Sequence, residues 1–184
     1  LVAPSAHIAP ELLLGDWDTA LDQAKFLGHQ YLIVPSLPDD TKTSLDAWRR
    51  WADTFNAAGA AARKAGIWLA QHNEPEHVHP IDGQIPYDLF IARTDPKFVR
   101  LQLDFGNMAI GGGDPMAYLE RYRARYWSFH VKNVVADRTH DTELAAGVLD
   151  LQALLAAIPD INARPCFVEQ ESPADELVSA KSNY

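Results

Sequence analysis

The sequence of 184 residues contains a single cysteine, Cys166, so an internal disulfide is excluded. Because Cys166 lies in the apolar run over residues 165–168, we expect it to be a small core residue and not a nucleophile. A lone cysteine implies no oxidising compartment. We therefore expect a cytoplasmic protein, with a periplasmic location left open because the chain begins without Met.

Positive charge is also scarce, because the sequence has 16 Lys and Arg but 25 Asp and Glu, which gives a formal net charge of −9. Proteins that bind nucleic acids need clustered Lys and Arg to neutralise phosphates, so we expect no nucleic-acid partner. No apolar run approaches the roughly 20 residues that span a bilayer, so we expect no membrane partner either. A small neutral or metal-bound ligand fits this composition better.

The sequence lacks a phosphate-binding fingerprint. Its one glycine-rich segment, Gly111-Gly-Gly-Asp-Pro115, fits neither the GxGxxG nor the Walker pattern. We interpret the segment as a flexible loop that leads into a helix at Pro115, the alternative being a loop that closes over a ligand.

Short apolar runs alternate with longer amphipathic stretches along the whole chain. The clearest helix covers residues 44–65, where Trp48, Trp51 and Phe55 belong to an apolar stripe that we expect to face the core. Strands separated by helices predict parallel βαβ units. The expected strands are residues 31–34, 67–70, 99–103, 126–129 and 166–168, and the other expected helices are 18–27, 116–123 and 149–158.

Polar groups that bind metals or move protons follow four of these apolar runs: His72, Asp104, His130 and Glu169. The carboxyl ends of parallel strands point to one face of a sheet, where ligands bind, so we expect these four groups to converge. A mixture of imidazole and carboxylate suits Mn²⁺, Zn²⁺, Co²⁺ or Fe²⁺ better than Ca²⁺ or Mg²⁺.

Several short motifs of the sequence, in their order and spacing, resemble those of the sugar phosphate isomerase/epimerase family. This family belongs to the xylose isomerase-like TIM barrels, with inosose dehydratases and ketose 3-epimerases. The resemblance covers nearly the whole chain, and these motifs carry it: Gln71-His-Asn73, Pro80-Ile-Asp-Gly83, Pro86-Tyr-Asp88, Gln102-Leu-Asp104, Gly112-Gly-Asp-Pro115, Ser128-Phe-His-Val-Lys-Asn133, Thr142 to Asp150 and Val168-Glu169.

The resemblance implies an α/β fold, a (β/α)8 barrel, with one divalent metal held by residues at the ends of the last four strands. On that pattern Asp104, His130 and Glu169 are metal ligands, with Glu171 as a substitute for Glu169. His77 stands where the family has its fourth ligand, a glutamate, and is predicted as a ligand and a second acid–base group. The expected metal is Mn²⁺, with Zn²⁺, Co²⁺, Fe²⁺ or Mg²⁺ as alternatives.

The same resemblance predicts substrate contacts from His7, after the third strand of the barrel, from His72, after the fifth, and from Lys132. It places residues 1–3 on the third strand of the barrel. We therefore expect residues 1–184 to form a single, incomplete barrel domain that lacks about the first two strands, and a homo-oligomer in which another chain completes the barrel stays open.

Three positions depart from the family's pattern: His77 replaces the ligand glutamate, Asn133 replaces an aspartate, and Ala145 replaces a glycine. The first departure weakens a mechanism in which two glutamates exchange the substrate's proton.

The predicted function is a metal-dependent isomerase or epimerase of a keto-sugar or related polyol, in which Glu169 abstracts a proton next to a metal-bound carbonyl. A sugar lyase of the inosose dehydratase type is the alternative. A sugar-binding barrel without catalysis also stays open, whereas endonuclease activity is disfavoured by the net charge of −9.

Overall fold

Strands and helices alternate along the chain, as the sequence predicts. The computed structural model describes residues 2–184, so Leu1, with which the predicted strand over residues 1–3 begins, lies outside the described residues. The chain falls into two compact units, Leu1–Gln102 and Leu103–Tyr184, whose boundary lies inside a strand. The single domain over residues 1–184 stays a prediction.

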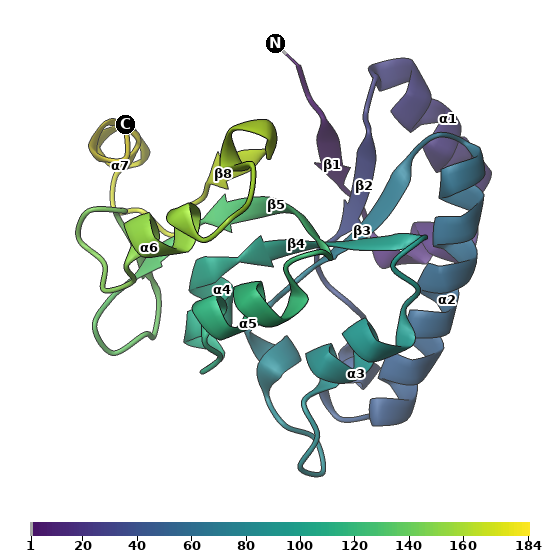
Figure 1. Cartoon of the computed structure of the whole chain (residues 1–184), viewed down its shortest axis with the longest axis horizontal. Helices are drawn as coiled ribbons and strands as arrows, with labels where there is room; N and C mark the ends of the chain where they lie inside the picture. The colour runs from purple at the N-terminus through teal and green to yellow at the C-terminus, as the bar shows by residue number, and fades with distance from the viewer. Residues whose placement is uncertain (1) are drawn as a thin grey trace. The chain divides into compact units, whose positions relative to one another are not determined.

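The first unit is built on parallel strands in the order β1, β2, β3 and β4. Helices α1 and α2 lie along one side of its first three strands (Figure 1). Four-residue 3₁₀ turns precede α1, α2 and α3. The elements are β1 (Ser5–His7), α1 (Trp17–Leu27), β2 (Tyr31–Val34), α2 (Leu45–Lys64), β3 (Trp68–His72), α3 (Pro86–Arg93) and β4 (Val99–Asp104), with 3₁₀ turns at Pro10–Leu13, Asp39–Lys42 and Pro75–Val78.

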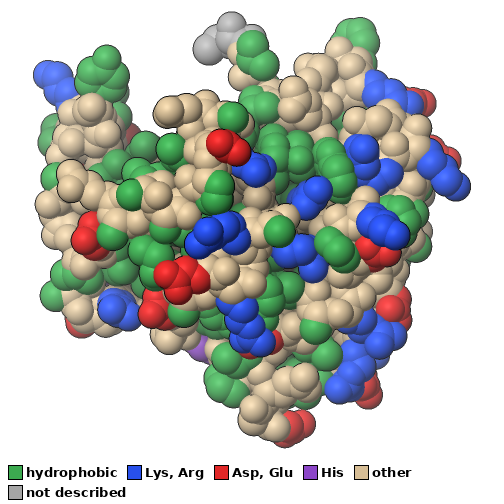
Figure 2. Space-filling view, viewed as in Figure 1, with side chains coloured by type: hydrophobic (Ala, Val, Ile, Leu, Met, Phe, Trp, Pro, Cys, Tyr) green, Lys and Arg blue, Asp and Glu red, His purple; other side chains and the backbone are tan. Residues whose placement is uncertain are grey.

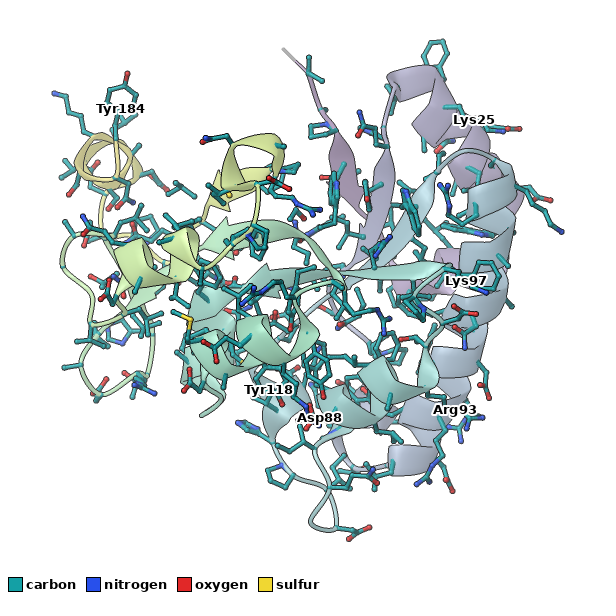
Figure 3. The ribbon with its side chains drawn as sticks, in the orientation of Figure 1. Lys25, Asp88, Arg93, Lys97, Tyr118 and Tyr184 are labelled. Carbon is teal, nitrogen blue, oxygen red and sulfur yellow. The ribbon has the colours of Figure 1, made fainter. Side chains whose placement is uncertain are left out.

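Helix α2 confirms the clearest of the predicted elements. It begins after Ser44, whose hydroxyl accepts the N–H of Ala47 at 3.2 Å, and Gly66 follows its end with a φ of +83°. The predicted apolar stripe is buried against the sheet and α3. At the surface, Arg93 of α3 donates two hydrogen bonds to Asp53 of α2, at 2.7 and 2.9 Å (Figure 3).

The second unit contains a parallel pair of strands and an antiparallel hairpin. Strand β5 pairs with β8, so that Val131 lies beside Val168, and the hairpin of β6 and β7 follows β5 directly. Among residues 2–184, the first unit has four parallel strands and the second has two, where a complete barrel has eight. The elements are α4 (Phe105–Ile110), α5 (Pro115–Tyr122), β5 (Tyr126–Val131), β6 (Asn133–Val134), β7 (Asp141–Thr142), α6 (Leu151–Ala156), a 3₁₀ turn (Ile161–Ala163), β8 (Cys166–Val168) and α7 (Glu176–Ser182).

Two expectations from the sequence are wrong. Cys166 is exposed, because β8 pairs with β5 on one side and, among residues 2–184, with no strand on the other. The first described strand is β1 at Ser5–His7, so His7 lies within a strand and not after one.

The surface carries charged side chains of both signs. Positive and negative side chains are interspersed on the face shown in Figure 2. Among residues 2–184, no helix combines the length and the apolar character that crossing a membrane requires.

Candidate metal centre

Asp104 is fixed by the start of a helix. It is the last residue of β4 and the cap of α4, and its Oδ1 accepts the N–H of Asn107 at 2.8 Å. The other oxygen, Oδ2, lies 3.0 Å from Nζ of Lys132 and 3.8 Å from Nδ1 of His130. The cap therefore orients a fully buried carboxylate, with one oxygen directed at these two side chains.

Two pairs of side chains face each other across β5 and the end of β8. Residues two apart on an extended chain point to the same side. Lys132 therefore lies on the same side as His130, and Glu171 on the same side as Glu169. The strand register brings the pairs together: His130 Nδ1 donates to Glu169 Oε2 at 2.7 Å, and Lys132 Nζ donates to Glu171 Oε1 at 2.6 Å. A hydrogen-bonded pair of His130 and Glu169 and an ion pair of Lys132 and Glu171 therefore lie side by side.

Lys132 is a buried cation surrounded by oxygen atoms. Besides Glu171, its ammonium lies 2.9 Å from Asn107 Oδ1, 3.0 Å from Asp104 Oδ2 and 3.1 Å from Glu169 Oε2. Burial by itself would lower the pKa of Lys132, but the neighbouring carboxylates hold that pKa well above its usual value. Lys132 therefore carries its charge at neutral pH.

Gly106 makes room for this lysine. A Cβ at position 106 would come within 2.5 Å of Lys132 Cγ and 2.6 Å of its Cδ. The absence of a side chain at Gly106 thus lets the stem of Lys132 cross the first turn of α4.

Glu169 is held in its ionised form. Burial would raise the pKa of Glu169, but the hydrogen bond from His130 and the charges of His130 and Lys132 hold that pKa well below its usual range. The side chain is about one-third exposed, so it is the most accessible of the three predicted ligands in this unit. An ionised, accessible carboxylate can bind a metal ion or accept a proton.

These three residues could together hold one divalent metal ion. The candidate ligand atoms of Asp104, His130 and Glu169 all lie within 4.8 Å of one another. Their mixture of carboxylate oxygen and imidazole nitrogen suits Mn²⁺, Zn²⁺, Co²⁺ or Fe²⁺. Three protein ligands would leave coordination positions for water or substrate, as in catalytic metal sites. The structure thus brings together three of the four ligands that the sequence predicts.

Two of the predicted substrate contacts lie side by side in the first unit. The ring centroids of His7 and His72 are 5.3 Å apart. His7 Nε2 is 2.7 Å from Gln102 Oε1, and His72 Nδ1 is 3.6 Å from Glu74 Oε1. The substrate contacts of His7 and His72 stay predictions, as does that of Lys132.

His77, also in the first unit, has the contacts of a structural residue. It lies in the 3₁₀ turn after β3, and its Nδ1 accepts the N–H of Glu74 at 3.0 Å and lies 3.1 Å from Gln71 Nε2. Its ring packs edge-on against Trp48, with centroids 4.9 Å apart. Burial, and secondarily the charge of His72, lower the pKa of His77 from 6.5 to about 3. The metal-binding and acid–base roles of His77 stay predictions.

The buried neutral state of His77 predicts a pH dependence of stability. Between pH 6.5 and about 3 the unfolded chain binds a proton here that the folded chain does not, so the free energy of unfolding falls as the pH is lowered. We expect a loss of about 1.4 kcal/mol for each pH unit below 6.5 from this group. Urea unfolding at pH 7, 5.5 and 4.5 should show this slope in the wild type and a shallower one in His77→Gln.

His79→Gln is the matched control, because His79 lies two residues further along and is exposed. This control should keep the wild-type slope. Equal slopes for wild type and His77→Gln would contradict the buried neutral state.

The structure explains why Asn133 stands where the family has an aspartate. Asn133 Nδ2 donates to the carbonyls of Leu144 and Leu149, at 2.7 and 3.3 Å, and its Oδ1 accepts the N–H groups of Val134 and Leu149. An aspartate could not donate the first two bonds. Asn133 therefore holds the loop after β7. The departure at Ala145 lies on the exposed part of the same loop, and nothing in the structure explains it.

The sequence alone does not single out the residues that support the three predicted ligands. Asn107 and Gly106 follow Asp104 directly in the chain, but only the helix cap and the lysine stem give them a role. For Glu171 a signal is present, because the alternation Glu-Gln-Glu places its carboxylate and that of Glu169 on one side of an extended chain.

Comparison with known proteins identifies the fold. The model of the family described as "Xylose isomerase-like TIM barrel" matches residues 4–183. A sugar phosphate isomerase/epimerase from Parabacteroides distasonis superposes with a TM-score of 0.83 at 23% identity, over 100% of this chain and 69% of that one. A structure described as IOLI protein with a bound zinc atom superposes with a TM-score of 0.68 at 16% identity, over 92% of this chain and 66% of that one. The predicted fold is confirmed.

Curated relatives carry a more specific name. Inosose dehydratase from Lacticaseibacillus casei is 32% identical over 129 residues, which cover 66% of this chain and 43% of that enzyme. Inosose dehydratase from Lactiplantibacillus plantarum is 33% identical over 106 residues, 57% of this chain and 34% of that enzyme. The chain thus spans less than half the length of these relatives.

Proposed function

Because the chain belongs to the xylose isomerase-like TIM barrels, we propose that it is a divalent-metal-dependent enzyme that removes a proton next to the carbonyl of a keto-sugar or keto-polyol. The observation that carries this proposal is the group of Asp104, His130 and Glu169 in the second unit. A divalent ion bound there would act as a Lewis acid, which polarises a carbonyl and acidifies the adjacent C–H. Mn²⁺ is the first metal to test, followed by Zn²⁺, Co²⁺, Fe²⁺ and Mg²⁺.

Each of the other steps of the reaction is assigned to a side chain in or near this group. Glu169 accepts the proton, since it is ionised and partly exposed. His130 holds this carboxylate in place through its N–H at 2.7 Å. Lys132, whose ammonium lies 3.1 Å from Glu169, is proposed to stabilise the negative charge that develops on the substrate's oxygen. His7 and His72 are proposed to contact the hydroxyl groups of the substrate.

Among the outcomes of this proton removal we place dehydration first. In that reaction the C–H proton and a hydroxyl group from the neighbouring carbon leave together as water. The support is the inosose dehydratases, since their sequences reach 32 and 33% identity. Isomerisation or epimerisation, in which the proton returns to another carbon or to the other face, is the second candidate. Its support is the sequence motif from Ser128 to Asn133.

Hydrogen exchange with solvent tests the proton transfer. Purified protein with Mn²⁺ is incubated in D₂O with a panel of inososes and keto-sugars, and mass spectrometry and NMR follow deuterium uptake, loss of water and new isomers. We expect deuterium next to the carbonyl of at least one compound, with loss of water for dehydration. If a compound demonstrably binds and no compound exchanges or reacts, the proposed proton abstraction is wrong.

A further inference from the structure

Glu171 lies outside the proposed ligand group but makes the shortest contact to Lys132. The Nζ–Oε1 distance is 2.6 Å, against 3.0 Å to Asp104 Oδ2 and 3.1 Å to Glu169 Oε2. Asp104 and Glu169 are also the carboxylates proposed to bind the metal. The ammonium and a divalent cation would therefore compete for the same two oxygens.

We propose that Glu171 is a positioning residue that holds the Lys132 ammonium and leaves Asp104 and Glu169 able to bind a divalent cation. This inference rests on the proposed metal site. Three carboxylates and one ammonium sum to a net charge of −2, which a divalent ion balances, since a histidine that binds a metal does so as the neutral imidazole. Without Glu171, the ammonium would neutralise one of the two remaining carboxylates and pair with both.

The main chain at Glu171 is anchored to the hairpin that follows the lysine. Asp141 Oδ2 accepts the N–H of Glu171 at 2.5 Å, and Asp141 lies on β7, whose partner strand β6 begins directly after Lys132. Val134 of β6 pairs with Asp141. One hairpin thus connects the lysine to the backbone that carries its carboxylate partner.

The burial of Lys132 gives this ion pair more effect than an ordinary surface pair. Glu171 is 58% exposed on its side chain, and exposed pairs contribute little to stability. Lys132 is 1% exposed, however. Removing one partner of a buried charge is costly unless another group of opposite charge pairs with it. The available alternatives are Asp104 and Glu169.

Calorimetric titration with MnCl₂ tests the proposal on wild type, Glu171→Gln, Lys132→Met and the double variant. We expect Glu171→Gln to weaken Mn²⁺ binding about 10-fold or more, the range for residues that support metal ligands. In the Lys132→Met background the same change should cost less than about 3-fold, because no ammonium is left to compete. Glu120→Gln, the same change at an exposed position of α5, should bind Mn²⁺ like the wild type.

Equal weakening in both backgrounds would show that Glu171 acts as a ligand or as a plain negative charge, and would overturn the proposal. No weakening in the wild-type background would also overturn it. If the wild type itself binds no Mn²⁺, it is the proposed metal site that fails. Should Lys132→Met not fold, Glu171→Asp replaces it: this variant keeps the charge but shortens its reach, so positioning predicts weakened binding and plain charge predicts wild-type binding.

Discussion

Replacing Glu169 with Gln should lower kcat by about 10³-fold, within the range that general acid–base groups contribute. The amide keeps the shape of the side chain but cannot accept a proton. The assay uses the compound that exchanges deuterium with the wild type, at saturating Mn²⁺, so that weaker metal binding does not cause the loss.

Glu176→Gln is the matched control for this change. Glu176 is exposed at the start of α7 and follows Glu169 in the same C-terminal segment. This control should keep wild-type turnover. A Glu169→Gln protein that retains more than about one-tenth of the wild-type kcat would contradict the role of Glu169 as the base.

Replacing His130 with Ala should weaken Mn²⁺ binding by more than about 100-fold, the upper limit for losing a residue that only supports a ligand. The change removes the only nitrogen of the three-residue group and the 2.7 Å hydrogen bond that holds Glu169. Calorimetric titration measures the affinity.

His140→Ala is the control for this variant, because His140 is exposed in the same unit. It should bind Mn²⁺ as the wild type does. Undiminished Mn²⁺ binding by His130→Ala would exclude His130 as a ligand.

The three grouped residues could be predicted from the sequence because each lies at, or directly after, the carboxyl end of an apolar strand. Parallel strands carry their carboxyl ends to one face, so Asp104, His130 and Glu169 needed no knowledge of side-chain packing to be placed together. Helix α2 could be predicted for a similar reason, since its period and its Ser44 cap are local features. Local patterns of this kind remain visible in a single sequence.

Features that depend on contacts between distant segments could not be predicted in this way. The contacts of His77 are an example, because the sequence does not show that its Nδ1 accepts the N–H of Glu74 or that its ring packs against Trp48. Cys166 lies in an apolar run like that of a buried strand, and only the pairing of β8 on one side explains its exposure. The link between Lys132 and Glu171 joins residues 39 positions apart.

The central claim is that Asp104, His130 and Glu169 hold one divalent metal ion. Anomalous diffraction from crystals soaked in MnCl₂, collected at the manganese edge, tests this claim most directly. We expect one strong peak within bonding distance of a carboxylate oxygen of Asp104, a ring nitrogen of His130 and a carboxylate oxygen of Glu169. A map with no peak at these three residues, from crystals of protein that binds or turns over a sugar, would contradict the account.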